Sequence, residues 1–128
     1  MTGYDLILQE RKRQIEVEGF TSEHDDKYVN GELVVAARCY RGYAMSKRLV
    51  DDESVLIHIK AVPDIWPLDF VWWKPKDITT SLVKSGALYL AEADRVERLG
   101  RNSNAELYRT IAKGVGSAID YTESEQTK

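Results

Sequence analysis

The sequence lacks the features that mark several common classes of protein. Cys39 is its single cysteine, which excludes an internal disulfide and a multi-cysteine zinc site. No apolar run approaches the roughly 18 residues of a membrane span, and the N-terminus lacks a signal-peptide pattern. No Gly-rich phosphate loop, nucleophile elbow, zinc-ligand spacing or internal repeat occurs. We therefore expect a cytoplasmic protein without a cofactor, a metal site or a recognisable catalytic set.

An excess of basic charge is also missing. The 128 residues contain 18 Lys and Arg against 21 Asp and Glu, so the net charge is −3. Nonspecific nucleic-acid binding needs a basic face, so nucleic acid is not the expected partner. Hydrophobic residues make up 43% and charged residues 30%, which is typical of globular proteins. We predict one helical domain over residues 1–120 and a disordered tail over residues 121–128.

The hydrophobic pattern predicts a mainly α, compact domain of four helices. Apolar residues recur at helical spacing in four segments. We expect these helices at residues 4–19, 31–45, about 78–99 and about 104–119. Asp77, Thr79 or Thr80 is expected to cap the third helix, and a capping box at Ser103 to Glu106 the fourth. Between the second and third helices, Val55, Ile57 and Ile59 alternate with other residues, which predicts at most one short strand.

Arg11 occupies an unusual place in the first helix. It lies on one face with Tyr4, Leu8, Ile15 and Glu18, at spacings of three and four. We predict that Arg11 is buried and paired with Asp25 or Asp26, because an unpaired buried guanidinium is very costly. The alternative is that its side chain merely extends from the edge of the stripe into solvent.

The densest polar cluster follows, in residues 20–26. His24 stands among Glu23, Asp25 and Asp26, so the turn contains candidate ligands for a divalent ion or an oriented general base. A metal-dependent nucleotide phosphohydrolase would use these four residues and Glu32. The alternative, which we favour, is a structural turn in which Thr21 or Ser22 caps and the aspartates accept hydrogen bonds.

The segment over residues 65–77 holds all three tryptophans and two of the three prolines. Such density is too apolar for a free linker and too rich in proline for a helix interior. We expect it to pack across the third helix at Gly86. Trp72, Trp73, Lys74 and Lys76 form a candidate site for a nucleotide-derived anion, because indoles stack on bases and lysines favour phosphate. The competing prediction places both tryptophans in the core.

Several short motifs follow one another along residues 7–98. They are Glu10–Ile15, Glu18–Thr21, Glu23–Asp26, Gly31–Leu33, Trp66–Pro67, Trp72–Pro75 and Leu82–Leu88. With these motifs the chain resembles a family of small, largely uncharacterised bacteriophage and prophage proteins. That family usually carries Trp at the position of Phe20 and Trp-Pro-Trp at Trp66 to Leu68. A fainter resemblance, over Glu18–Thr21, Asp25, Trp66–Pro75 and the helix after Asp77, points to the ryanodine-receptor repeat domain, whose prokaryotic relatives are associated with sensing nucleotide signals.

These resemblances imply a phage accessory protein in the host cytoplasm, a binding protein rather than an enzyme. It would bind a nucleotide-type small molecule, with a role in counter-defence through sequestering a host immune signal. The predicted ligand-binding residues are Trp72, Trp73, Lys74, Lys76, Arg11, His24, Asp25 and Asp26. One alternative is the phosphohydrolase described above, and another is a protein-binding inhibitor of a host enzyme. We also predict a homo-oligomer, because a lone strand over residues 55–59 would need a partner from a second chain.

Overall fold

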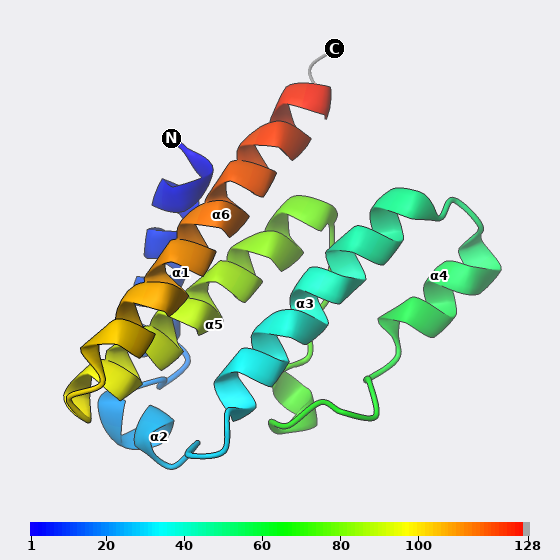
Figure 1. The fold of residues 1–128 in the computed structure, drawn as a ribbon. Helices are drawn as coiled ribbons and strands as arrows, with labels where there is room; N and C mark the ends of the chain where they lie inside the picture. Colours follow the sequence, from blue (N-terminus) through cyan, green and yellow to red (C-terminus); the bar gives the residue numbers. More distant parts are fainter. Residues whose placement is uncertain (127–128) are drawn as a thin grey trace.

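The computed structural model describes residues 1–126, and every regular element in this range is helical (Figure 1). The elements are α1 (Gly3–Glu16), α2 (Ser22–Asp26), α3 (Glu32–Leu49), α4 (Glu53–Lys60), the 3-10 turn η1 (Phe70–Trp72), α5 (Ile78–Arg98) and α6 (Asn102–Gln126). The prediction of a mainly α fold is confirmed, with six α-helices in residues 1–126 where four were expected.

The predicted strand over residues 55–59 is wrong. This segment forms α4, and Asp52 caps it by accepting a hydrogen bond from the backbone N–H of Ser54 at 2.9 Å. A short apolar run fits a strand and a helix equally well, so the capping residue decides its structure. The reason for expecting an unpaired strand edge is thereby removed, and homo-oligomer formation stays a prediction.

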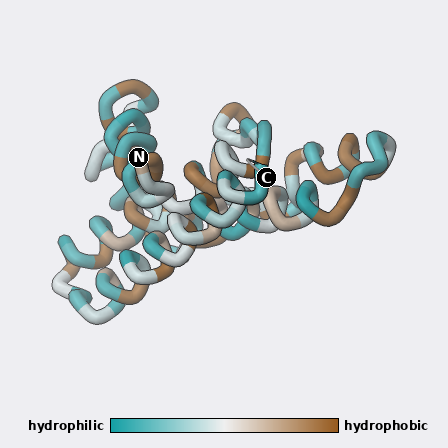
Figure 2. Tube along the Cα trace, turned by 90° about the horizontal axis from the view of Figure 1, so that it is seen from above, coloured by the Kyte–Doolittle hydropathy of each residue, from teal (hydrophilic) through white to brown (hydrophobic). Residues whose placement is uncertain are grey.

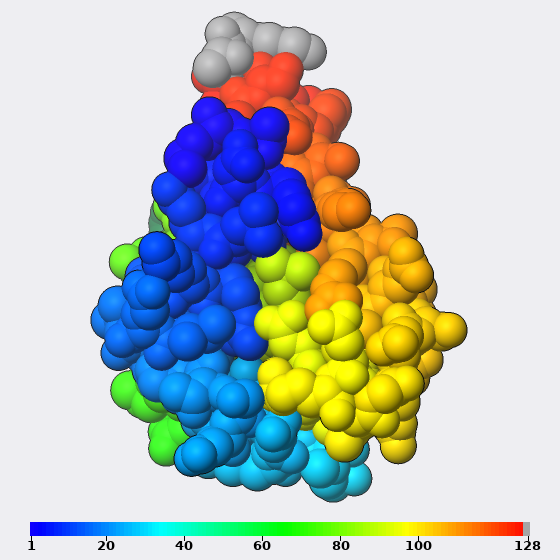
Figure 3. Space-filling view, turned by 90° about the vertical axis from the view of Figure 1, so that its left-hand side faces the viewer, coloured from blue at the N-terminus to red at the C-terminus, as the bar shows by residue number. Residues whose placement is uncertain are grey.

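Helix α5 is the centre of the molecule and packs against α1, α3 and α6. Thirteen of its 21 residues are buried, so it has almost no solvated face. Six of the buried residues are small, namely Ser81, Ser85, Gly86, Ala87, Ala91 and Ala93. Small side chains let the neighbouring helices approach closely, and the Ser85 hydroxyl donates to the carbonyl of Ala37 on α3 at 2.8 Å. In Figure 3, α1 and α6 flank the part of α5 that reaches the surface.

The predicted contact between Gly86 and the tryptophan segment is also wrong. Gly86 faces Ile7 of α1, and a Cβ at Gly86 would overlap the Ile7 side chain. Ile7 is fully buried, so it has little room to move. The helix α1 docks where α5 offers no side chain, whereas the tryptophans pack elsewhere.

Gly86→Ala is expected to lower the free energy of unfolding by about 1–3 kcal/mol, because the new methyl group overpacks the contact with Ile7. Gly42→Ala is the matched control. Gly42 also lies within a helix, but a Cβ there meets open space, so this change should stabilise by about 0.5–1 kcal/mol. Adding Ile7→Val to Gly86→Ala should cost less than the two single losses together. Urea unfolding of Gly86→Ala, Gly42→Ala, Ile7→Val and the double variant, each compared with the wild type, measures these differences. Strictly additive losses for Gly86→Ala and Ile7→Val would place the overlap elsewhere.

The buried face of α1 differs from the predicted stripe. Gly3, Ile7, Arg11 and Gln14 are buried, whereas Leu8 is 45% and Ile15 38% exposed. The predicted spacings of three and four residues were correct for a helix, but the starting residue of the stripe was not. Close packing selects the face that carries Gly3, since a Cβ there would overlap the carbonyl oxygen of Gly116 on α6.

The C-terminal helix is longer than predicted. It begins at Asn102, so Ser103 lies inside the helix and is not its cap. It continues to Gln126, where a disordered tail was expected from Tyr121 onward. Thr122 is buried, and its hydroxyl accepts a hydrogen bond from Arg48 at 2.6 Å. The last two residues of the predicted tail, 127 and 128, lie outside the described residues.

Helix α4 stands at the edge of the molecule beside α3, and hydrophobic residues occur along it (Figure 2). None of its residues is buried. Apolar side chains such as Ile57 on α4 and Ile65, Phe70 and Val71 in the following segment are more than half exposed. Within residues 1–126, no helix combines the length and the hydrophobicity that crossing a bilayer requires.

Candidate functional site

Trp66 and Trp73 belong to a buried aromatic cluster with Tyr40 and Tyr43. The Trp73 ring centroid lies 4.9 Å from that of Tyr40 and 5.0 Å from that of Trp66. Its indole N–H donates to the carbonyl of Lys60 at 2.9 Å, which ties the segment to the end of α4. Trp73 is therefore a core residue, and its position does not support the predicted ligand-binding role.

Trp72 packs against the edge of the hydrophobic core and is only half-buried. Its ring meets that of Phe20 edge to face at 4.8 Å, and the Lys74 ammonium lies 5.4 Å from its centroid. The Tyr40 hydroxyl fixes the backbone here, because it donates to the Trp72 carbonyl at 2.6 Å and accepts from the Lys74 N–H at 2.7 Å. Burial raises the pKa of Tyr40 to about 12, so the hydroxyl keeps its proton at neutral pH.

A small cavity lies behind Trp72. Its lining consists of Gln14, Glu18, Phe20, Tyr40, Trp66, Leu68, Trp72, Lys84 and Leu88. Its volume is about 10 Å³, which is about enough for one water molecule. Four aromatic rings and one buried amide make this the most aromatic of the hollows described within residues 1–126.

A charged groove adjoins the cavity and shares Glu18 and Lys84 with it. Its volume is about 340 Å³, and its lining consists of Glu10, Arg13, Glu18, Lys74, Lys76, Thr80 and Lys84. Four of these side chains are basic and two are acidic. Small-ligand sites usually have about 300–1,000 Å³, so the groove has the size for a phosphate-bearing ligand.

Ion pairs connect the charged side chains of the groove to one another. Arg13 pairs with Glu10 at 2.8 Å and with Glu18 at 2.7 Å. Lys74 pairs with Glu18 at 3.3 Å, and Lys84 lies 3.6 Å from Glu10. Burial opposes ionisation of Glu18, but Arg13 and Lys74 outweigh it and lower the pKa of this carboxyl. Burial also lowers the pKa of Lys84, because removing the ammonium from water disfavours its charged form.

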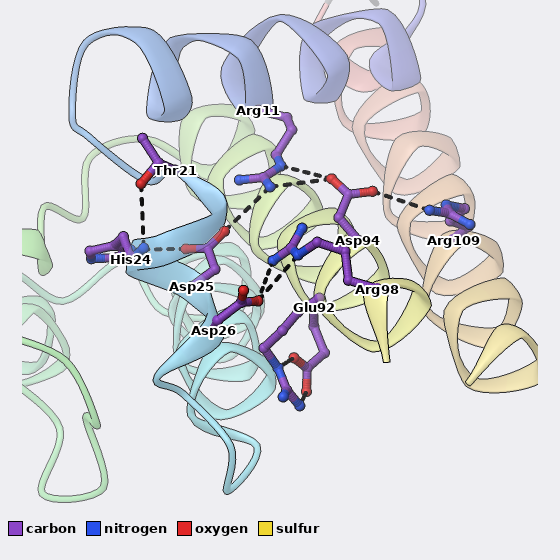
Figure 4. Close-up of polar contacts among 10 residues, drawn as sticks. Arg11, Thr21, His24, Asp25, Asp26, Glu92, Asp94, Arg98 and Arg109 are labelled. Atoms are coloured by element: carbon purple, nitrogen blue, oxygen red, sulfur yellow. Dashed lines mark hydrogen bonds and ion pairs between the residues drawn. The ribbon is translucent and has the colours of Figure 1, made fainter. Parts of the chain in front are cut away.

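The polar turn is built around Arg11 (Figure 4). The guanidinium lies between two carboxylates, with Nη2 3.3 Å from Asp25 Oδ2 and 3.2 Å from Asp94 Oδ2. Asp25 is fully buried, and burial raises the pKa of its carboxyl against the lowering effect of His24 and Arg11. The predicted burial of Arg11 and its pairing with Asp25 are confirmed. Asp26 instead pairs with Arg98 at 2.6 Å.

The remainder of the turn supports the wall of the cavity. The Thr21 hydroxyl caps α2 by accepting from the N–H of His24 at 3.3 Å, and the imidazole contacts Asp25 at 2.9 Å. The His24 ring stacks on Phe20 with centroids 4.5 Å apart, and Phe20 in turn meets Trp72. Arg11, Asp25 and His24 do not line the cavity, and His24 contacts its wall at Phe20.

The turn does not form a metal site in this fold. Over residues 1–126, no three His, Cys, Asp or Glu side chains come close enough to bind one ion. Asp25 is shared between His24 and Arg11, and Asp26 points to Arg98. This arrangement favours the structural interpretation of residues 20–26 over the phosphohydrolase.

The structure brings together Trp72, Lys74 and Lys76 of the predicted site, but sequence reasoning missed their neighbours. Gln14 comes from α1, Lys84 from α5, and Glu18 and Phe20 from the loop between α1 and α2. A signal existed for Glu18, Phe20 and Lys84, because each lies in one of the short motifs described above. Gln14 also lies in such a motif, Glu10–Ile15, and it follows the buried Arg11 at a helical spacing of three residues.

Comparison of the chain with protein-family models, curated proteins and solved structures gives no match. The resemblance to small bacteriophage proteins, and the fainter one to the ryanodine-receptor repeat domain, therefore stay predictions.

Proposed function

We propose that this protein binds a nucleotide-type small molecule at the junction of the charged groove and the aromatic cavity. The observation that carries the proposal is the sharing of Glu18 and Lys84 between the two hollows. A ligand with a flat ring on one side and phosphates on the other matches this pairing of aromatic and basic walls.

The phosphates would lie among Arg13, Lys74, Lys76 and Lys84. The Lys74 side chain is 44% exposed in its pair with Glu18, and exposed pairs contribute only about 0–1 kcal/mol. The Lys84–Glu10 pair is long, at 3.6 Å. A phosphate therefore replaces a carboxylate as the partner of a lysine at small cost. Lys76 extends this basic wall, since its backbone is fixed by the Tyr43 hydroxyl at 2.9 Å while its side chain is exposed.

The ring would stack on Trp72. The present cavity is too small for a nucleobase, so the Trp72 side chain must swing outward as the ring enters. Trp72 closes a 3-10 turn of three residues and is only half-buried, which leaves its side chain less constrained than those of Trp66 and Trp73. Stacking of a base on an aromatic ring contributes about 1–3 kcal/mol.

This proposal describes binding without chemical conversion. Sequestration of a host immune signal is the biological role that the resemblance to phage proteins implies. The predicted contributions of Arg11, His24 and Asp25 are then indirect, because these residues hold Phe20 in the cavity wall.

A thermal-shift panel of linear and cyclic nucleotides tests the proposal. A nucleotide at about 100 times its dissociation constant should add roughly 2.7 kcal/mol to the free energy of unfolding. Lys84→Met should greatly reduce this gain while changing the melting temperature of the free protein little, because Glu10 keeps Arg13 as a partner and burial already opposes the charge of Lys84. Lys12→Ala removes an exposed charge from α1 outside the groove and should respond like the wild type. A panel without any shift, or a normal response from Lys84→Met, contradicts the proposed site.

A further inference from the structure

Gln14 stands out among the polar residues of the cavity wall. It is 97% buried, with 3% of its surface exposed, and it lines the cavity. Its Oε1 has no hydrogen-bond partner within residues 1–126. Buried polar groups are nearly always paired, so an exception needs a physical reason.

The other polar groups around the cavity are already engaged. The Tyr40 hydroxyl both donates and accepts a hydrogen bond, and the Trp66 indole N–H donates to the Asp69 carbonyl at 3.1 Å. Glu18 is held by Arg13 and Lys74. Lys84 lies 3.6 Å from Glu10 and lines both the cavity and the groove. The Gln14 amide oxygen is therefore available to accept a hydrogen bond from a group that enters between the aromatic rings.

We infer that Gln14 binds the edge of the ligand's ring, and that the ligand is a nucleotide whose base places a hydrogen-bond donor beside an acceptor. This inference rests on the function proposed above. A glutamine side chain offers one acceptor and one donor in a plane, and it pairs through both with a base edge of the opposite pattern. The base edge would satisfy Oε1, while the rings of Phe20 and Trp72 enclose the faces of the base.

The variant Gln14→Met tests the inference, because methionine keeps the length of the side chain and removes the amide. Loss of a two-point contact should weaken binding of a nucleoside diphosphate by at least about 5-fold. Binding of inorganic pyrophosphate, which has no ring, should not change. The free protein should melt at the same temperature or higher, since an unpaired buried amide is gone.

Titration calorimetry with pyrophosphate and the diphosphates of adenosine, guanosine, cytidine and uridine gives the required affinities. Gln14→Leu repeats the test with a second apolar side chain should Gln14→Met fold poorly. If the wild type binds no nucleoside diphosphate, the proposed function is overturned and the inference falls with it. If nucleotides bind the wild type and both variants equally well, the function stands and the role of Gln14 is overturned. An equal loss for pyrophosphate and nucleotides would show that Gln14 only supports the fold.

Discussion

Replacing Arg11 by alanine is expected to lower the free energy of unfolding by about 3–5 kcal/mol. The guanidinium is the charged partner of Asp25, whose side chain is fully buried. Without Arg11, Asp25 keeps only His24 beside it and must ionise in an apolar surrounding or take up a proton. Arg11 also links α1 to α5 through Asp94, so the change weakens two contacts at once.

Arg98→Ala is the matched control for this prediction. Arg98 also pairs with a carboxylate of the polar turn, at 2.6 Å from Asp26, but both side chains of this pair are about a third or more exposed. Its loss should cost no more than about 1 kcal/mol. Urea denaturation measures both values. Equal losses for Arg11→Ala and Arg98→Ala would mean that the Arg11 side chain is solvated in solution.

Trp73→Ala should be as damaging, with a loss of about 3–5 kcal/mol. The indole fills the space among Tyr40, Tyr43 and Trp66, and its N–H holds the end of α4. Trp72→Ala should cost clearly less, because its ring is half-buried and lies outside that cluster.

The two tryptophans should therefore separate core from site. Trp72→Ala is expected to remain folded and to lose most of the thermal shift given by a nucleotide, since the stacking ring is gone. Trp73→Phe, which keeps an aromatic core residue, should retain that shift. The reverse pattern, with normal binding by Trp72→Ala and none by folded Trp73→Phe, would show that the ligand's ring stacks on Trp73 and not on Trp72.

Local signals in the sequence predicted much of the fold. Helical spacing located α1, α3, α5 and α6, and Asp77 caps α5 as expected, accepting from the N–H of Thr80 at 2.6 Å. The first helix ends at Glu16, before the predicted residue 19, and Gly19 adopts the left-handed backbone conformation in the turn that follows. Spacing gives the period of a helix but not its rotation, so α1 was predicted with Leu8 rather than Ile7 toward the core. The partner of Gly86 was missed for the same reason.

Contacts between residues far apart in the sequence were the part of the candidate site that could not be predicted. The contact of Arg11 with Asp25 was predictable, because a buried guanidinium needs a carboxylate and the nearest acidic cluster follows in sequence. Asp94 is 83 residues away, and no local pattern links it to Arg11. Trp72 and Lys74 were identified only from the unusual composition of the segment over residues 65–77, which holds all three tryptophans. Gln14 and Lys84 join them only because α1 and α5 pack side by side.

A crystal structure of the protein with the nucleotide that gives the largest thermal shift tests the proposed site most directly. We expect the phosphates among Arg13, Lys74, Lys76 and Lys84, and the base stacked on an outward-turned Trp72 with its edge against Gln14. A nucleotide bound at any other surface, with Trp72 still closing the cavity as it does in the free protein, would contradict the proposed site.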